Sequence, residues 1–287
     1  MKNLMQLKAF CKNLGEKTGI PAQVVLQNYI IERILERIAA SRFRTRLILK
    51  GGVLVSSTLG LDVRTTMDLD LSARQLLCSS GRLKTVFDEI CAIDVEDSFS
   101  FVVSGAEEIR VMDKYPSIRL TLRATFMSLH ETVKIDVTSG DKITPKEQMF
   151  EKRRLFQEGS FQICAYNIET VLAEKLETIL SRSTQNTRLR DYYDVYVLAN
   201  RKHAPINLKH LRLAFLATTQ RRGTTQLIEA YSEIIENIHA DKTMAALWMK
   251  YGKAFPYAAE ISFRQVCGSV KRLLASILEP PSKGQSK

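Results

Sequence analysis

The chain has 287 residues, a formal net charge of +11 and a pI near 9.4. Its 45% hydrophobic and 25% charged residues are typical of a globular protein with a substantial core, which excludes a disordered or fibrous chain. The five cysteines lack the paired spacing of a zinc site or a disulfide framework, and no run of about 18 apolar residues predicts a membrane span. We therefore expect a cytoplasmic protein that does not enter the membrane. The basic charge suits an anionic partner such as nucleic acid, although simple solubility explains it equally well.

Residues 21–40 follow the pattern of an amphipathic helix. Pro21 suits a helix start, because the N–H that it lacks would have no partner there. Apolar residues recur at helical spacing and charged residues fall on the other side: Val24, Val25, Ile31, Leu35 and Ile38 against Glu32, Arg33, Glu36 and Arg37. We expect this helix to lie over the core with its apolar side.

The stretch that begins at Leu47 follows the pattern of a strand that leads through a Gly-Gly turn into a helix. A short apolar stretch is followed by Gly51 and Gly52 and then by small residues. Because glycine has no Cβ, the N–H groups at such a helix start can approach a phosphate, which the helix dipole attracts. The stretch therefore predicts a phosphate-binding turn.

A second strand carries an acid pair, Asp68 and Asp70. Side chains alternate along a strand, so these two carboxylates share a face, with their Cα atoms about 6–7 Å apart. Met67, Leu69 and Leu71 would then point into a core. Carboxylates this close repel unless a cation lies between them, and Mg²⁺ or Mn²⁺ accepts oxygen ligands of this kind. A phosphate-binding turn beside a metal-binding acid pair indicates phosphoryl or nucleotidyl transfer.

Further elements are predicted downstream: a helix at 82–93 and strands at 99–103, 117–126 and 132–138. The last strand carries Asp136 between β-branched residues. A lone acid on a strand is commonly a surface residue, yet a strand beside residues 67–71 would bring Asp136 to the acid pair. Because the apolar-Asp-apolar pattern recurs, we favour a place for Asp136 at the metal site.

From about residue 160 the pattern becomes helical, and two predicted helices carry ionisable residues on their apolar stripes. Lys175 lies in line with Ile168, Leu172 and Ile179, and Asp191 and Asp194 lie on the stripe of the next helix. The lysine either snorkels to the surface or holds a bound phosphate. If it holds a phosphate, methionine at this position should preserve packing and leave the melting temperature unchanged or raised. The two helices would form the second wall of a cleft.

The strongest basic tract lies between Asp194 and Glu229, where the sequence has no acid. Its lysines and arginines are Arg201, Lys202, Lys209, Arg212, Arg221 and Arg222. The tract is either a solvated helix face or a surface for a phosphate backbone, and the missing counter-charge favours nucleic acid. The tail at 280–287 should be disordered.

In this order, the motifs resemble those of the AbiEii/AbiGii-type nucleotidyltransferase toxins, a group that includes the MenT toxins of bacterial toxin–antitoxin systems. The resemblance covers roughly residues 45–200. Its Gly-Gly turn and Asp-x-Asp strand match the residues above, and the family's preceding Arg and hydroxyl residue resemble Arg64 and Thr65 or Thr66. The family's later Lys resembles Lys175. Its Arg-x-Lys-Asp-x-x-Asp motif resembles residues 188–194, with Arg190 in place of the Lys.

The resemblance implies an α/β (α+β) nucleotidyltransferase fold, in which a mixed sheet is flanked by helices. Residues 1–160 would form this core with its N-terminal helices, and residues 161–279 a mainly helical C-terminal lobe that completes the cleft. The implied reaction transfers a nucleoside monophosphate from a nucleoside triphosphate (NTP), with Mg²⁺ or Mn²⁺ and release of pyrophosphate. The acceptor would be the 3′ end of tRNA, and the toxin would inhibit translation and growth and have a cognate antitoxin.

The nucleotidyltransferase hypothesis assigns a role to each of the candidate site residues. Asp68 and Asp70 hold the metal, with Asp136 as a third ligand or a base for the acceptor, while Lys175 neutralises phosphate charge and Asp191 orients Lys175 or the acceptor. The NTP would be bound by Gly51, Gly52, Ser56, Arg64, Thr66, Arg188 and Arg190. Two alternatives stay open: nucleotidylation or other phosphoryl transfer to a protein, and a non-catalytic module that binds nucleic acid or a partner. The retained pair of repelling acids argues against the non-catalytic module.

Overall fold

The computed structural model describes residues 3–109, 117–200 and 205–279. The chain forms two compact units, of which the first comprises Met1–Asp141 and Glu147–Tyr166 and the second Lys142–Lys146 and Asn167–Lys287. The predicted tail at 280–287 lies outside the described residues. The predicted division into 1–160 and 161–279 stays a prediction.

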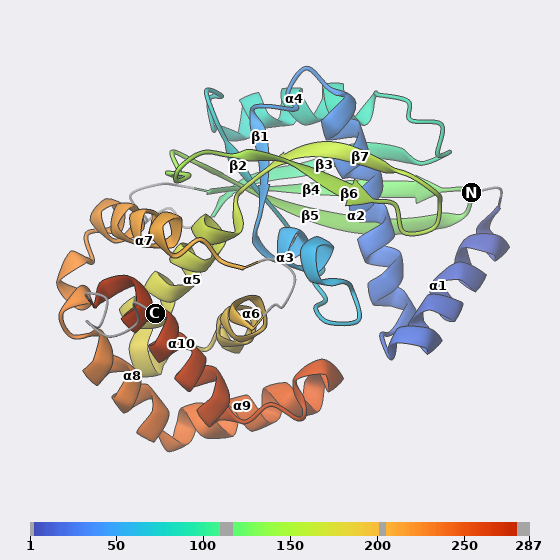
Figure 1. The fold of residues 1–287 in the computed structure, drawn as a ribbon. Coiled ribbons are helices and arrows are strands. Elements are labelled where there is room, and N and C mark those ends of the chain that lie inside the picture. The colour runs from blue at the N-terminus through green and yellow to red at the C-terminus, as the bar shows by residue number, and fades with distance from the viewer. Residues whose placement is uncertain (1–2, 110–116, 201–204, 280–287) are drawn as a thin grey trace. The chain divides into compact units, whose positions relative to one another are not determined.

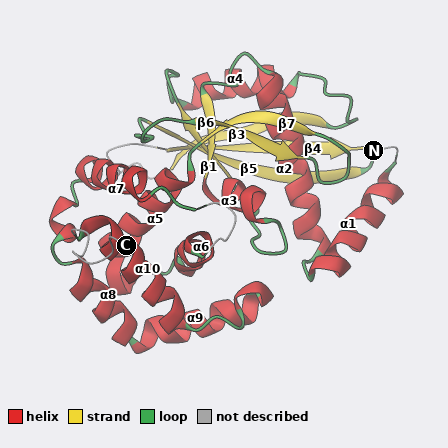
Figure 2. Ribbon diagram, in the orientation of Figure 1, coloured by secondary structure: helices red, strands yellow, loops and turns green. Residues whose placement is uncertain are grey.

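The first unit is built on a seven-stranded mixed sheet (Figures 1 and 2). In spatial order the strands are β3 (Ser100–Ile109), β4 (Ser117–Phe126), β5 (Leu129–Ser139), β2 (Leu69–Ala73), β1 (Leu47–Lys50), β7 (Ser160–Ala165) and β6 (Gln148–Arg153). The β2–β5 and β1–β7 pairs are parallel and the other pairs are antiparallel. The strands predicted at 99–103, 117–126 and 132–138 are confirmed as β3, β4 and β5. With the helices described next, the sheet makes the unit an α/β fold.

Helices flank this sheet. They are α1 (Leu4–Thr18), α2 (Ala22–Ala40), α3 (Gly51–Leu59) and α4 (Ser80–Cys91), so the helices predicted at 21–40 and 82–93 are confirmed. The α2 helix contacts β5, β7 and α4, while α3 contacts β1 and β2. The core between helices and sheet is apolar: the side chains of Ile34, Leu49, Leu71 and Ile135 are each 0% exposed.

The charged side of α2 is also buried, contrary to the simple amphipathic pattern. Arg33 and Arg37 are 1% and 2% exposed, and Glu32 is 0% exposed. The carboxylate of Asp97 accepts two hydrogen bonds from Arg37, while Lys152 forms an ion pair with Glu32. Burial lowers the pKa of Lys152, although the Glu32 carboxylate opposes that shift. Asp97 and Lys152 are distant in sequence, so local periodicity could not show these counter-charges of Arg37 and Glu32.

The second unit is helical. It contains α5 (Ile168–Arg182), α6 (Leu189–Ala199), α7 (Leu208–Arg222), α8 (Tyr231–Ala240), α9 (Lys242–Ala254) and α10 (Phe263–Leu278), with short 3₁₀ turns at Ser183–Gln185, Thr225–Ile228 and Pro256–Ala258. The α10 helix contacts α6, α7, α8 and α9, and its buried face includes Val266, Val270 and Leu274 (Figure 1). Ser262 and Gln265 form a capping box at its start. Across the described residues of both units, we find no helix whose length and apolar character would let it cross a membrane.

Candidate functional site

The Gly-Gly turn at the end of β1 is confirmed, and it packs against the acid pair. Gly51 starts α3 with φ +66, a conformation that side chains other than glycine rarely adopt. A Cβ on Gly51 would lie 2.1 Å from Oδ2 of Asp70, and a Cβ on Gly52 would lie 2.8 Å from Oγ1 of Thr66. Both glycines are therefore needed where this backbone meets its neighbours, and the Asp70 carboxylate lies directly against the start of the helix.

The acid pair lies at the beginning of β2. Asp68 is exposed and immediately precedes the strand, while Asp70 is half-buried within it. Leu69 and Leu71 are 0% exposed, as alternation predicts. The expectation that Met67 points into the core is wrong, because Met67 precedes the strand at a bend and is 46% exposed.

Four ionisable residues lie in one row across adjacent strands. Asp70 is opposite Lys50 on β1 and opposite Asp136 on β5, and Asp136 is opposite Arg119 on β4. Residues directly opposite one another project from the same face of a sheet, so the order across the strands is Arg119, Asp136, Asp70 and Lys50. The prediction that β5 lies beside β2, with Asp136 next to the acid pair, is confirmed.

Asp136 is held by an arginine to which the sequence analysis assigned no role. Its two carboxylate oxygens accept hydrogen bonds of 2.8 Å each from Nε and Nη2 of Arg119. These hydrogen bonds raise the pKa of the Arg119 guanidinium, burial opposes the shift, and the charges of Asp136 and Asp68 raise the pKa further. The alternation of β4 predicted the strand, but only its register with β5 could identify this pair.

The donor set suits a divalent cation that is completed by substrate. Within the described parts of the chain, no group of three or more His, Cys, Asp or Glu side chains could hold a metal ion. Mg²⁺ is commonly bound by one or two carboxylates together with substrate phosphates and water. Asp68 and Asp70 meet that requirement, whereas Asp136 as a third ligand would first have to leave Arg119.

Lys50, at the other end of the row, forms an ion pair with Asp141. Its Nζ lies 2.7 Å from Oδ2 of Asp141, which also accepts a hydrogen bond from Thr138. Burial by itself would raise the pKa of Asp141, but the Lys50 ammonium and hydrogen bonds from Lys50, Thr138 and Ser72 hold that pKa well below its usual range. The Lys50–Asp141 pair therefore stabilises the edge of the site while Asp141 is ionised.

The Lys50–Asp141 pair predicts a specific dependence of stability on pH. Because the pKa of Asp141 is lower in the folded chain than its unfolded value of about 3.9, the pair's contribution is present above that value and is lost as the pH falls toward the folded-state pKa. We expect Asp141→Asn to lower the free energy of unfolding at pH 7. The difference in unfolding free energy between Asp141→Asn and the wild type, measured by urea denaturation, should shrink below about pH 4. A gap that stays constant from pH 7 to pH 3 would contradict the assignment.

Three residues predicted to bind the NTP are buried beneath the turn. Arg64 is 2% exposed and donates to the carbonyl of Thr65, and Thr66 is 4% exposed. Ser56 is 3% exposed, and its hydroxyl donates to the carbonyl of Val53 at 3.0 Å. Arg64 and Thr66 lie against the Gly52 backbone, and the hydroxyl of Ser56 bonds within its own helix, so a role for these three residues in NTP binding stays a prediction.

In the second unit, Lys175 is held between two buried carboxylates. Its Nζ lies 2.7 Å from Oδ1 of Asp191 and 2.7 Å from Oδ2 of Asp194. The side chains of Lys175, Asp191 and Asp194 are 11%, 4% and 0% exposed, so this lysine does not snorkel to the surface. Nε of Arg188 lies 3.2 Å from Oδ2 of Asp191. The predicted inward direction of these side chains is confirmed. Asp191 contacts Lys175, one of the two partners predicted for it, and the catalytic roles of both residues stay predictions.

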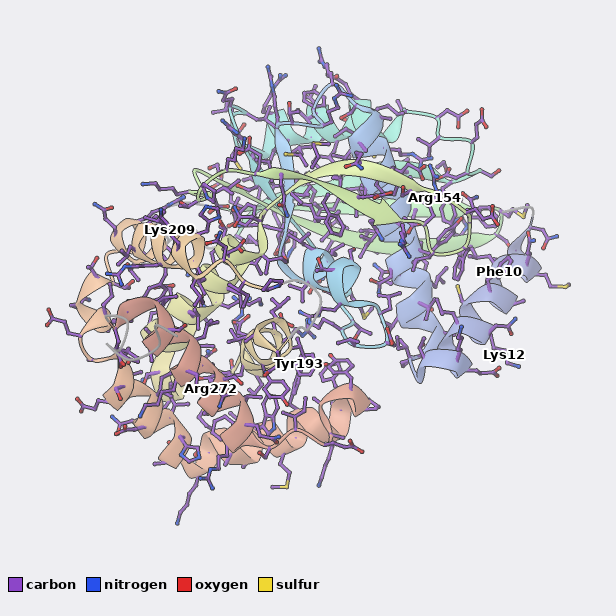
Figure 3. The ribbon with its side chains drawn as sticks, viewed as in Figure 1. Phe10, Lys12, Arg154, Tyr193, Lys209 and Arg272 are labelled. Atoms are coloured by element: carbon purple, nitrogen blue, oxygen red, sulfur yellow. The ribbon has the colours of Figure 1, made fainter. Side chains whose placement is uncertain are left out.

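Aromatic residues surround the same helix. Arg190 lies over the ring of Phe255 at 5.6 Å, which is within cation–π range. Figure 3 labels Tyr193 on α6, and its ring centroid lies 4.8 Å from that of Tyr257 and 6.3 Å from that of Tyr251. The helix that carries the acids is thus anchored by packing as well as by charge.

Two arginines of the basic tract have partners in the fold that the sequence did not indicate. Arg222 forms an ion pair with Glu177 of α5, and Nη1 of Arg212 donates to the carbonyl of Ile277 at 2.6 Å. Lys209 is exposed on α7 (Figure 3), and Arg221 lies in the last turn of that helix. Arg201 and Lys202 lie outside the described residues. Acids and carbonyls from other helices therefore occupy two of the predicted nucleic-acid contacts, Arg212 and Arg222.

A mixed sheet with a Gly-Gly turn into a helix, next to an acid pair at the beginning of a neighbouring strand, defines a nucleotidyltransferase-type domain. The chain belongs to the family described as the nucleotidyl transferase AbiEii toxin of type IV toxin–antitoxin systems, whose model matches residues 33–268. The recognition of this family from sequence motifs is confirmed, and the match extends beyond the region of resemblance on both sides.

Comparisons with individual proteins give only distant matches. No curated protein sequence matches the chain. A candidate nucleotidyltransferase of H. pylori has a TM-score of 0.49 and 16% identity, with 90% of this chain and 97% of that chain covered. The JHP933 protein of Helicobacter pylori has a TM-score of 0.48 and 16% identity, with 89% and 93% covered. An antigenic nucleotidyltransferase-like protein of Paracoccidioides brasiliensis has a TM-score of 0.38 and 14% identity, with 70% and 90% covered.

Proposed function

We propose that the protein transfers a nucleoside monophosphate from an NTP to the 3′ end of tRNA and releases pyrophosphate. As a toxin it would thereby inhibit translation and growth, and a cognate antitoxin would counteract it. Membership of the AbiEii family supports the nucleotidyltransferase activity and the toxin–antitoxin context. The choice of tRNA as the acceptor is our proposal.

One observation carries the proposed activity: the carboxylate of Asp70 lies against the backbone of Gly51, at the start of α3. A helix start offers N–H groups and a positive partial charge to the phosphates. The neighbouring carboxylates offer oxygen ligands to a divalent cation that the same phosphates bind. This arrangement supports a role for the turn in holding the triphosphate and for the acid pair in holding its metal.

Asp68 and Asp70 are the residues that would hold Mg²⁺ or Mn²⁺, and the buried Leu69 and Leu71 hold β2 in place beneath them. A metal held by these two carboxylates would supply positive charge that stabilises the phosphoryl oxygens and the leaving pyrophosphate. The chain itself positions the triphosphate through the glycine turn. Fixed positions matter because this chemistry depends mainly on orientation and charge stabilisation.

We also assign Lys175, Asp191, Arg188 and Arg190 of the helical unit to the proposed reaction. In this proposal Lys175 faces the phosphates, and Asp191 and Asp194 hold its ammonium in place. The guanidinium groups of Arg188 and Arg190 add charge that suits phosphate oxygens. The protein's net charge of +11 supports an RNA acceptor, with Lys209, Arg221, Arg201 and Lys202 as its proposed contacts.

A labelling experiment tests this function. The purified chain is incubated with each α-labelled NTP, Mg²⁺, and either total RNA or total protein, and we expect label on tRNA with at least one NTP. Label on protein alone would replace the tRNA proposal with protein nucleotidylation. No label on either polymer, with Mg²⁺ or with Mn²⁺, would contradict the enzyme proposal and favour a binding module.

A further inference from the structure

The ion pair between Arg119 and Asp136 lies directly beside the acid pair. Both carboxylate oxygens are bound by one guanidinium, at 2.8 Å each, in the fork geometry that arginine forms with carboxylates. Asp136 is 15% exposed and Arg119 32% exposed, so the pair lies at an accessible surface of the sheet. It is also directly next to Asp70, which is opposite Asp136 in the parallel β2–β5 pair.

Arg119 offsets the mutual repulsion of these acids. Neighbouring strands lie about 4.8 Å apart, so ionised Asp70 and Asp136 would repel each other strongly if no cation were near. The Arg119 guanidinium neutralises Asp136, and it is close enough to Asp68 for that charge to raise the pKa of Arg119. Arg119 therefore supplies the positive charge that a second cation would otherwise provide.

We propose that Arg119 acts as a lock on the metal site: its ion pair with Asp136 keeps this carboxylate from binding a metal until nucleotide is bound. This proposal rests on the function proposed above. A triphosphate at the Gly51–Gly52 turn would offer the guanidinium a phosphate in place of a carboxylate, because arginine binds both groups with the same two-pronged geometry. Once released, Asp136 becomes available as a third carboxylate beside Asp68 and Asp70. The chain would thus have a weak metal site without nucleotide and a stronger one with it.

The same strand offers a matched control. Arg123 lies four residues beyond Arg119 on β4, so it projects from the same face, but it is opposite Thr132 and is exposed. Arg123→Gln removes the same charge as Arg119→Gln from the same strand and leaves Asp136 with its guanidinium. A difference between these two variants therefore reports on the ion pair, because the change in net charge is identical.

The first measurement is Mn²⁺ binding to the full chain without nucleotide, by calorimetry or by electron paramagnetic resonance of free Mn²⁺. We expect Arg119→Gln to bind Mn²⁺ about tenfold more tightly than Arg123→Gln, because a charged hydrogen-bonded competitor has been removed. Adding Asp136→Asn to Arg119→Gln should abolish this gain. Arg119→Lys should fall between the wild type and Arg119→Gln, because lysine keeps the charge and loses the fork.

The second measurement is binding of inorganic tripolyphosphate in the presence of a chelator, which removes any metal. We expect Arg119→Gln to bind this anion about tenfold more weakly than Arg123→Gln, because the guanidinium that should transfer to phosphate is missing. Melting temperatures of all variants establish that the chain is folded. Arg119→Lys provides the comparison if Arg119→Gln does not fold.

The outcomes separate this inference from the proposed function. Equal Mn²⁺ affinity for Arg119→Gln and Arg123→Gln would overturn the lock, even if the protein labels tRNA. Tighter Mn²⁺ binding with unchanged tripolyphosphate binding would overturn the release of Arg119 by nucleotide. Both expected shifts in a protein that labels no polymer would uphold the lock and overturn the transferase.

Discussion

Asp70→Asn should lower the rate of nucleotidyl transfer by at least about 10³-fold, because the amide keeps the shape of the side chain and loses the charge that binds the cation. Asp70 is also the acid that lies against Gly51, so this position joins the metal to the phosphate-binding turn. The measurement is incorporation of label into the acceptor that the wild type modifies. Expression of the chain alone gives a second readout: the wild type should arrest growth and Asp70→Asn should not.

A matched control is available in the preceding loop. Asp62 is exposed, and Asp62→Asn makes the same chemical change in the segment that leads to β2. We expect Asp62→Asn to keep its transfer rate and its toxicity. Asp70→Asn should keep its fold, as checked by circular dichroism and by melting temperature. Wild-type turnover in folded Asp70→Asn would refute the metal assignment, and equal growth of both strains at equal expression would support a binding module.

Lys175→Met should destabilise the protein by about 3–5 kcal/mol, because it leaves Asp191 and Asp194 buried without the ammonium between them. The sequence alone predicts the opposite, because methionine would relieve the cost of burying a charge. The structure predicts a loss of stability instead. The ammonium of Lys175 is already paired with two carboxylates, so its removal leaves two acids of like charge facing each other. The measurement is the free energy of unfolding from urea denaturation.

A neutralised cluster separates stability from catalysis at Lys175. In the triple variant Lys175→Met, Asp191→Asn, Asp194→Asn no buried charge is left unpaired within the cluster, and we expect it to recover most of the lost stability. Its transfer rate should still be at least about 10²-fold below wild type, since no ammonium remains to face the phosphates. Lys250→Met, at an exposed position of α9, is the control for loss of one positive charge. Wild-type transfer by a folded triple variant would show that the cluster is structural only.

Much of the local structure could be predicted from the sequence. The two-residue alternation of β4, the helical spacing of α2 and the Gly51–Gly52 turn all depend on residues close together along the chain. The same holds for the inward stripe of α5, on which Lys175 lies, although the stripe alone leaves open whether this lysine snorkels to the surface or holds a phosphate. These patterns also sufficed to recognise the family, because its motifs are short and local.

The partners of the charged groups were decided by the tertiary structure. Arg119 reaches Asp136, Lys50 reaches Asp141 and Arg37 reaches Asp97 only because strand register and helix packing bring distant segments together. Arg222 was interpreted as a nucleic-acid contact because no acid lies near it in sequence, yet Glu177 of α5 lies beside it in the fold. The periodicity of a sequence indicates from which face of its helix or strand a side chain projects. The charge that it meets depends on a second segment whose register no local pattern contains.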